Sequence, residues 1–331
     1  MAASARGRGG RHGPAADRTL PSVPSPDTGP PMVCIGGVVA DRVVRLDAPP
    51  VPGTSNPGSV VASPGGVARN VAENLARLGH RPALVSVIGD DTVGTSLVSG
   101  VRAAGVDARG VRTSPEDVTA EYVAVLAPDG ELVLGVAVMT VLDRITTEDV
   151  DAAWPPAGGW VVLDCNARPE VLAHAVARAQ ADSDVRLVVV AVSAPKVTRL
   201  PSDLTGVDLL FCTRDEAQAW LAAAGRAVPP EEADPELLAA LRAAGAWAVV
   251  ITRGAGGAIG GDGDGVADLP GERVPVVDVT GGGDALVAGT VSALSQGQDL
   301  AAALRHGMRA AALTVAVQGA VRPDLATALQ G

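Results

Sequence analysis

Short apolar runs alternate with stretches of helical periodicity through the carboxyl-terminal half of this chain. The runs typical of buried strands are Trp160–Asp164, Leu187–Val192, Leu209–Cys212 and Ala248–Thr252. The helices between and after them are expected at Glu170–Ala181, Arg214–Ala224, Pro235–Ala244, Asp284–Gln296 and Leu300–Val317. Because strands that alternate with helices return in the same direction, the pattern predicts an α/β fold with a central, mostly parallel sheet and helices on both faces.

The amino-terminal half follows the same rule with one interruption. Strands are expected at Met32–Ile35 and Ala83–Ile88, and helices at Pro64–Gly79 and Thr95–Ala104. Two β-rich segments, Tyr122–Leu126 and Glu131–Val138, flank Pro128-Asp129-Gly130, which is typical of a hairpin. This hairpin, the β-rich Val38–Leu46 and the polar, turn-rich Asn56–Ser63 break the alternation. We therefore expect a small β lid outside the main sheet, formed by parts of residues 38–63 and 118–140.

Composition limits the function classes. Apolar residues make up 47% of the 331 residues and aromatic residues only 2%, so the core must consist mainly of Val, Leu and Ala. A net charge of −11 argues against nucleic acid as a partner, since binding it requires a basic face. No apolar stretch reaches the roughly 20 residues that span a bilayer, so no membrane segment is expected.

The amino-terminal tail and the cysteines suggest an intracellular protein. Residues 1–31 are rich in Gly, Pro, Ser and Arg, which predicts a disordered tail before one domain at residues 32–331. The tail lacks the apolar segment of a secretory signal. The three cysteines are widely spaced and fit reduced thiols better than disulfides. We therefore expect a cytoplasmic location.

A glycine triplet, Gly281, Gly282 and Gly283, stands directly before a predicted helix and is followed by Asp284. Such a helix start exposes N–H groups without helical partners, and these groups with the helix dipole favour a phosphate. A carboxylate beside a phosphate is repelled unless it accepts a proton, for example from a hydroxyl that attacks the phosphoryl group. The alternative interpretation is a glycine turn with an aspartate cap, which is a common feature.

The Walker A and protein-kinase patterns are absent from the sequence. Lys196 is the only lysine and follows VSAP, which excludes a Walker A loop, and no HRD or DFG tripeptide is present. A second glycine-rich segment, Thr252–Gly257, follows a predicted strand and could let a nucleotide approach the backbone. By itself it is equally typical of a hairpin turn, and its context does not fit a dehydrogenase.

Two spaced glycine signals now bracket the chain: Gly65-Gly66 followed by Asn70, and the triplet followed by Asp284. With DVTGGGDALVAG at Asp278–Gly289, the sequence resembles the ribokinase-like (PfkB) family of carbohydrate kinases, whose signature is D-T-x-G-A-G-D. Within that family it resembles the pseudouridine kinase branch, through SNPG at Ser55–Gly58, DCN at Asp164–Asn166 and VSAPK at Val192–Lys196.

The resemblance implies a ribokinase-like fold and 5′-phosphorylation of a ribosyl C-nucleoside, a small-molecule substrate, by ATP with Mg²⁺. It implies that Asp284 is the catalytic base and that Gly281, Gly282 and Gly283 form an anion hole. It assigns the nucleotide loop to Thr252, Gly254 and Gly257, and sugar binding to Asp41, Gly65, Gly66 and Asn70. It further places Glu216 near Mg²⁺ through water, and Asp278 with Thr280 near a monovalent cation such as K⁺.

The chain departs from the family pattern at four polar positions. Thr213 replaces the asparagine of N-x-x-E, Val39 replaces an asparagine two residues before Asp41, and Ala191 stands where the branch has D-P. The lid segment Gly135–Thr140 also lacks the Asp or Asn of the branch. Two alternatives therefore stay open: a kinase of the same fold with another acceptor, and a nucleotide-binding sensor. The exposed edges of a small lid also suggest a homodimer formed through it.

Overall fold

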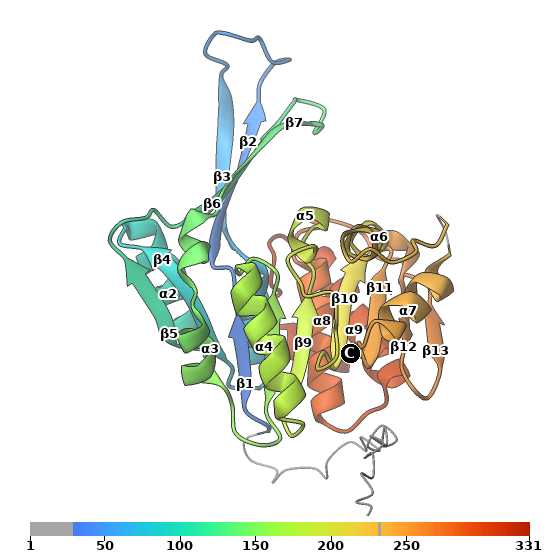
Figure 1. Cartoon of the computed structure of the whole chain (residues 1–331). Helices are drawn as coiled ribbons and strands as arrows, with labels where there is room; N and C mark the ends of the chain where they lie inside the picture. The colour runs from blue at the N-terminus through green and yellow to red at the C-terminus, as the bar shows by residue number, and fades with distance from the viewer. Residues whose placement is uncertain (1–28, 231–232) are drawn as a thin grey trace, which may run out of the picture.

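A large, mostly parallel β-sheet runs through the middle of the protein (Figure 1). The computed structural model describes residues 29–230 and 233–331, and within them this sheet has nine strands. In spatial order they are β13 (Val266–Leu269), β12 (Ala258–Gly261), β11 (Ala248–Thr252), β10 (Leu209–Thr213), β9 (Arg186–Val190), β8 (Trp160–Asp164), β1 (Met32–Ile35), β4 (Ala83–Gly89) and β5 (Asp107–Ser114). Strands β5 to β11 in this order pair in parallel, whereas β12 and β13 are antiparallel. The predicted α/β class is confirmed.

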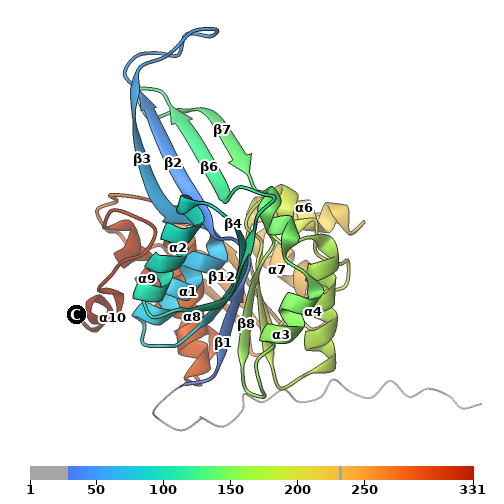
Figure 2. The same ribbon diagram turned by 90° about the vertical axis from the view of Figure 1, so that its left-hand side faces the viewer.

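Helices cover both faces of the sheet (Figure 2). One face carries α1 (Val67–Arg77), α2 (Thr92–Ala103), α8 (Gly282–Ser295) and α9 (Leu300–Val315), with α10 (Leu325–Gln330) packed on α9. The other face carries α3 (Thr147–Ala153), α4 (Pro169–Ala181), α6 (Arg214–Ala223) and α7 (Asp234–Ala243). The short α5 (Ala194–Val197) packs on α6, and two 3₁₀ turns are η1 (Thr140–Arg144) and η2 (Gly254–Gly256).

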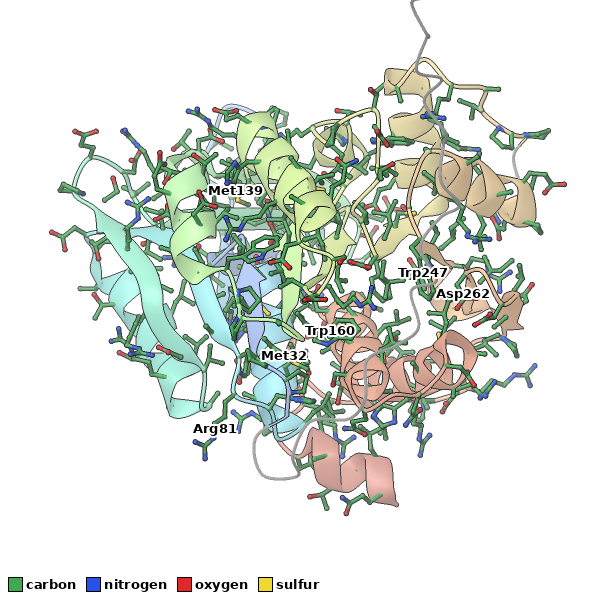
Figure 3. All side chains as sticks on the ribbon, turned by 60° about the horizontal axis from the view of Figure 1, so that its bottom comes forward. Met32, Arg81, Met139, Trp160, Trp247 and Asp262 are labelled. Atoms are coloured by element: carbon green, nitrogen blue, oxygen red, sulfur yellow. The ribbon has the colours of Figure 1, made fainter. Side chains whose placement is uncertain are left out.

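The two helical layers explain why the central strands are rich in Val and Leu. All five residues of β8 are buried, as expected for a strand covered on both faces. Alternate strand residues contribute to two separate buried clusters, one under each helical layer. Figure 3 shows Met32 and Trp160 close together at the amino-terminal ends of β1 and β8, in agreement with their pairing in the sheet. The opposite edge, where the parallel strands end, is left for the lid and the candidate site.

The lid is a separate four-stranded sheet that rises from this carboxyl edge (Figure 1). Its strands, in order, are β3 (Gly58–Gly65), β2 (Val39–Leu46), β6 (Ala120–Leu126) and β7 (Leu132–Val138). The predicted hairpin is β6 and β7, and it pairs with β2 through a parallel contact with β6. No strand was predicted for the turn-rich Asn56–Ser63, but most of this segment belongs to β3, which pairs with β2 along eight residues.

Other differences from the sequence expectations are local. The glycine-rich segment after β11 was expected to be typical of a hairpin turn, and it leads into β12, whose Gly260 and Gly261 pair with β11. Most of the predicted tail, residues 1–28, lies outside the described residues; the Pro31 carbonyl accepts a hydrogen bond from the backbone N–H of Trp160, at 2.8 Å. Among the described helices, none is long and apolar enough to cross a membrane.

Candidate active site

The first turn of α8 is built on the glycine triplet. Gly281 has a φ of 75°, and a Cβ at this position would lie 2.0 Å from the Ala320 carbonyl oxygen. Only glycine fits this left-handed, closely packed position. Gly283, by contrast, is exposed, and a Cβ there would meet no atom within 4 Å. The amino-terminal N–H groups of α8 therefore stand at an open surface, where the helix dipole favours an anion.

Asp284 lies in this first turn and contacts a helix from the other end of the chain. The Asn70 side-chain nitrogen, on α1, donates a hydrogen bond of 2.7 Å to Asp284 Oδ2. Burial raises the pKa of the Asp284 carboxyl to about 7, and the nearby Asp164 and Asp41 act in the same direction. The hydrogen bond from Asn70 and the positive charge of Arg69 oppose this rise. Asp284 can therefore exchange a proton near neutral pH, as a general base must.

The resemblance places Asn70 in the sugar-binding turn, and in the structure its amide nitrogen lies against Asp284. Asp41, on β2, lies directly over Gly65, where an added Cβ would be 2.0 Å from the Asp41 carboxylate. Gly66 has a φ of 95° and packs against the Gly37 carbonyl. Burial raises the pKa of Asp41, and Arg69 opposes this effect. The structure thus brings Asp41, Asn70 and Asp284 into one polar site at the base of the lid.

The second glycine-rich segment forms the tight connection between β11 and β12. Gly254 and Gly257 have φ values of 56° and 95°, and a Cβ on Gly257 would lie 2.0 Å from the Leu269 carbonyl oxygen. Thr252 ends β11, and its hydroxyl donates to the Cys212 carbonyl at 3.5 Å. Gly254 is exposed at the carboxyl edge of the sheet, so this loop offers backbone at the same edge as the start of α8.

The expected cation ligands make contacts of their own. Glu216 and Thr213 form a capping box at the start of α6, in which Glu216 Oε2 accepts from the Thr213 N–H at 2.7 Å. Burial raises the pKa of Glu216. The Asp278 carboxylate accepts from the N–H groups of Thr280 and Gly319, at 2.9 and 3.0 Å.

Among the described residues, no group of three or more His, Cys, Asp or Glu side chains could hold a metal ion. A single carboxylate such as that of Glu216 nevertheless fits Mg²⁺, which is commonly held by one or two carboxylates together with substrate phosphates. Glu216 has one carboxylate oxygen that is not used in the capping box and is the candidate for this contact.

Asp164 was assigned no role from the sequence, but its carboxylate joins three backbone segments beneath the site. This fully buried carboxylate accepts backbone hydrogen bonds from Gly37, Ala68 and Asn166, at 2.9, 3.0 and 2.9 Å. It thereby caps the start of α1, which has no side-chain cap of its own. Lys196 donates to the side-chain oxygen of the neighbouring Asn166. Asp164, Asn166 and Lys196 belong to the DCN and VSAPK segments. In the sequence these segments indicated only a family resemblance, not the contacts between these residues.

Comparison with known proteins identifies the family. The model of the pfkB family of carbohydrate kinases matches residues 31–327. The chain belongs to this family. The pseudouridine kinase of Escherichia coli (strain K12) is 30% identical over 283 residues, which cover 83% of this chain and 87% of that protein.

Solved structures of the same fold agree with this assignment. A carbohydrate kinase from Agrobacterium tumefaciens is 30% identical, with a TM-score of 0.76 over 91% of this chain and 96% of its own. The Arabidopsis thaliana ribokinase complexed with ribose and ATP has the same TM-score of 0.76 over 92% of this chain and 100% of its own, at 20% identity. The protein is therefore a sugar or nucleoside kinase with a ribokinase-like fold.

Proposed function

We propose that this kinase transfers the γ-phosphoryl group of ATP to the 5′-hydroxyl of a ribosyl nucleoside, with pseudouridine as the best single candidate. The observation that carries the proposal is the meeting of Asp284 and Asn70 at the open start of α8. A base with a pKa near 7 beside free helix N–H groups suits attack of a hydroxyl on a phosphoryl group. The similarity to the E. coli pseudouridine kinase supports the choice of acceptor.

In this mechanism Asn70 holds Oδ2 of Asp284, which leaves Oδ1 to receive the proton of the attacking hydroxyl. The hydroxyl oxygen forms a bond to the γ-phosphorus while the bond to the β-phosphate oxygen breaks, so the products are a phosphate ester and ADP. The N–H groups of Gly281, Gly282 and Gly283 stabilise the charge on the transferred group. Thr252, Gly254 and Gly257 hold the nucleotide. Mg²⁺, near Glu216, would neutralise the phosphate charge, and a monovalent cation would lie near Asp278 and Thr280.

The lid supplies the acceptor side of the site. Pairing places Ser63, Asp41, Tyr122 and Ala137 opposite one another across the four strands, so they share one face of the lid. Asp41 on this face is close enough to Arg69 for the arginine charge to lower the pKa of its carboxyl group. We assign the ribose hydroxyls to Asp41, with Gly65 and Gly66 beneath it. The contribution of β7 to this face is small and apolar, so a base would meet few hydrogen-bonding groups there.

This arrangement predicts a ribosyl acceptor with a loose base preference. An apolar surface distinguishes similar ligands by factors of only about 10–200, whereas a site that hydrogen-bonds a base edge discriminates far more strongly. We therefore expect turnover with pseudouridine and, within this factor, with uridine. ADP production should be measured with pseudouridine, uridine, other nucleosides, ribose and fructose 6-phosphate. Turnover with the phosphosugar alone would rule out a ribosyl acceptor.

One observation favours a second candidate, a nucleotide sensor with little turnover. Thr213 replaces the asparagine expected near Mg²⁺, and it binds Glu216 in the capping box. Thermal-shift measurements with ATP–Mg²⁺, combined with the assay of product from the acceptor panel, separate the two candidates. A clear rise in melting temperature with ATP, without product from any acceptor, would favour the sensor. Formation of product would show that the protein is a kinase.

We also propose that two copies of the chain associate through their lids. The lid face opposite Asp41 carries Val60, Leu134 and Val136, which are 59%, 55% and 42% exposed. Exposed apolar residues in a contiguous patch on a small sheet are typical of an interaction surface. In a symmetric pair the same patch would cover itself.

This dimer predicts a selective effect of charge on the lid. Val60→Glu should lower the molecular mass measured by sedimentation equilibrium to that of one chain, because a carboxylate would be buried without a partner. Val266→Glu is the matched control, since Val266 is also 59% exposed but lies on β13 at the far end of the large sheet. A Val60→Glu protein with the parent's mass would contradict association through this face.

A further inference from the structure

Arg69 stands in the middle of a line of side chains that ends at Asp284. It lies on α1 with only 5% of its surface exposed. Its guanidinium donates to the side-chain oxygen of Asn70 and, at 2.6 Å, to Glu73. Glu73 also accepts from Arg77 at 3.1 Å. Since Asn70 donates to Asp284, a continuous path of hydrogen bonds runs from Glu73 through Arg69 and Asn70 to Asp284.

The donor and acceptor roles along this path follow from the chemistry of the side chains. A guanidinium has donors only, so the Asn70 atom that faces Arg69 must be the amide oxygen. The amide nitrogen of Asn70 is then forced to face Asp284, where it donates to the carboxylate. Without Arg69 the Asn70 oxygen would lose this donor, and the Asp284 carboxylate would orient the amide without that support. Arg69 therefore helps to fix which end of Asn70 the base meets.

The charges around Asp284 make Arg69 important for a second reason. The carboxylate is faced by Asp41 from β2 and by Asp164 from β8, and both disfavour its ionised form. From α1 it is faced by Arg69 and by the neutral Asn70, and both favour that form. Arg69 is thus the cation that offsets two neighbouring carboxylates.

We propose that Arg69 is a positioning residue for the base, which acts through the amide of Asn70 and is itself held by Glu73. The proposal rests on the role of Asp284 put forward above. Arg69 is assigned no contact with substrate. Its function is to keep Asp284 Oδ2 bound to Asn70 and Oδ1 free for the acceptor hydroxyl, and to favour the ionised form of the carboxylate.

The test is the pH dependence of kcat/KM in Arg69→Met, which removes the cation and its donors while preserving most of the side-chain length. Loss of a nearby opposite charge is expected to move the midpoint of the rise in kcat/KM to higher pH by about one unit or more. The matched control is Arg77→Met, which removes the other arginine bound to Glu73 and should keep the parent midpoint. An Arg69→Met midpoint equal to that of the parent would overturn the proposal.

A second variant decides the matter if Arg69→Met does not fold. Asn70→Leu removes the donor to Asp284 without adding a charge, so the midpoint should again rise and kcat should fall at pH 7. If Asn70 only bound the sugar, the variant would raise the KM of the acceptor and leave the midpoint unchanged. That result would also overturn the proposal.

A measurement without turnover separates this proposal from the assignment of function. The carboxyl ¹³C signal that is lost in Asp284→Asn can be titrated in the ligand-free protein by NMR. Its midpoint should be higher in Arg69→Met than in the parent and in Arg77→Met. An unchanged NMR midpoint refutes the positioning role of Arg69 even if the enzyme is an active kinase. A raised midpoint supports this role even if the acceptor has been wrongly chosen.

Discussion

Asp284→Asn is expected to lower turnover by about 10²–10⁴-fold, which is the usual contribution of a general base. Asparagine has nearly the same shape but cannot accept the proton of the acceptor hydroxyl. The affinity for ATP, measured by calorimetry, should stay close to that of the parent, since the N–H groups of Gly281–Gly283 are unaltered. Asp299→Asn, at the exposed cap of α9, is the control for loss of a carboxylate and should retain parental turnover. Parental turnover in Asp284→Asn would exclude Asp284 as the base.

The same substitution has a predictable effect on stability. Burial raises the pKa of Asp284 from its ordinary 3.8 to about 7, so between these values the folded protein holds a proton that the unfolded chain has lost. The parent therefore loses stability as the pH rises from about 4 to about 7. Asp284→Asn has no group to ionise, and above pH 7 it should be more stable by on the order of 1–3 kcal/mol. Urea denaturation at pH 4 and pH 8 checks this, and the gain should be absent at pH 4.

Contiguous features of the site were accessible from the sequence, because their chemistry needs only neighbouring residues. The glycine triplet and Asp284 follow one another, and the dihedral of Gly281 explains why one of those glycines is required. The alternation of strands and helices gave the α/β class for a similar reason, since strand burial is set by local runs of Val and Leu. Such features depend little on how distant parts of the chain meet.

Contacts between residues far apart in the sequence could not be predicted from local patterns. Asn70 and Asp284 are 214 positions apart, and nothing in their local sequence indicates that one binds the other. Arg69 would ordinarily be assigned to the exposed face of α1, yet it is buried, with its two Nη groups bound to Glu73, Asn70 and Pro64. Strand β3 was missed because its polar and proline residues are poor strand formers, and pairing with β2 overrides that preference.

Gly281→Ala should destabilise the protein and remove its activity, because the start of α8 cannot accept a side chain at this position. A left-handed backbone costs a non-glycine residue roughly 1–2 kcal/mol. The new Cβ would also lie 2.0 Å from the Ala320 carbonyl oxygen, so the backbone must move.

The total loss is expected to reach at least about 2 kcal/mol in urea denaturation. Displaced N–H groups would no longer meet the phosphate, so ATP affinity should fall together with turnover. This result differs from that of Asp284→Asn, where only turnover falls.

Gly283→Ala provides the matched comparison within the same triplet. Its Cβ would meet no atom within 4 Å, and alanine is favoured over glycine in a helix by roughly 0.5–1 kcal/mol. Gly283→Ala should therefore be at least as stable as the parent. If the two variants unfold at the same urea concentration, the left-handed turn at Gly281 is not what fixes the start of α8, and the anion site must be held by other contacts. If only Gly281→Ala is destabilised and loses ATP affinity, the close approach of Gly281 to Ala320 is what holds the N–H groups in position.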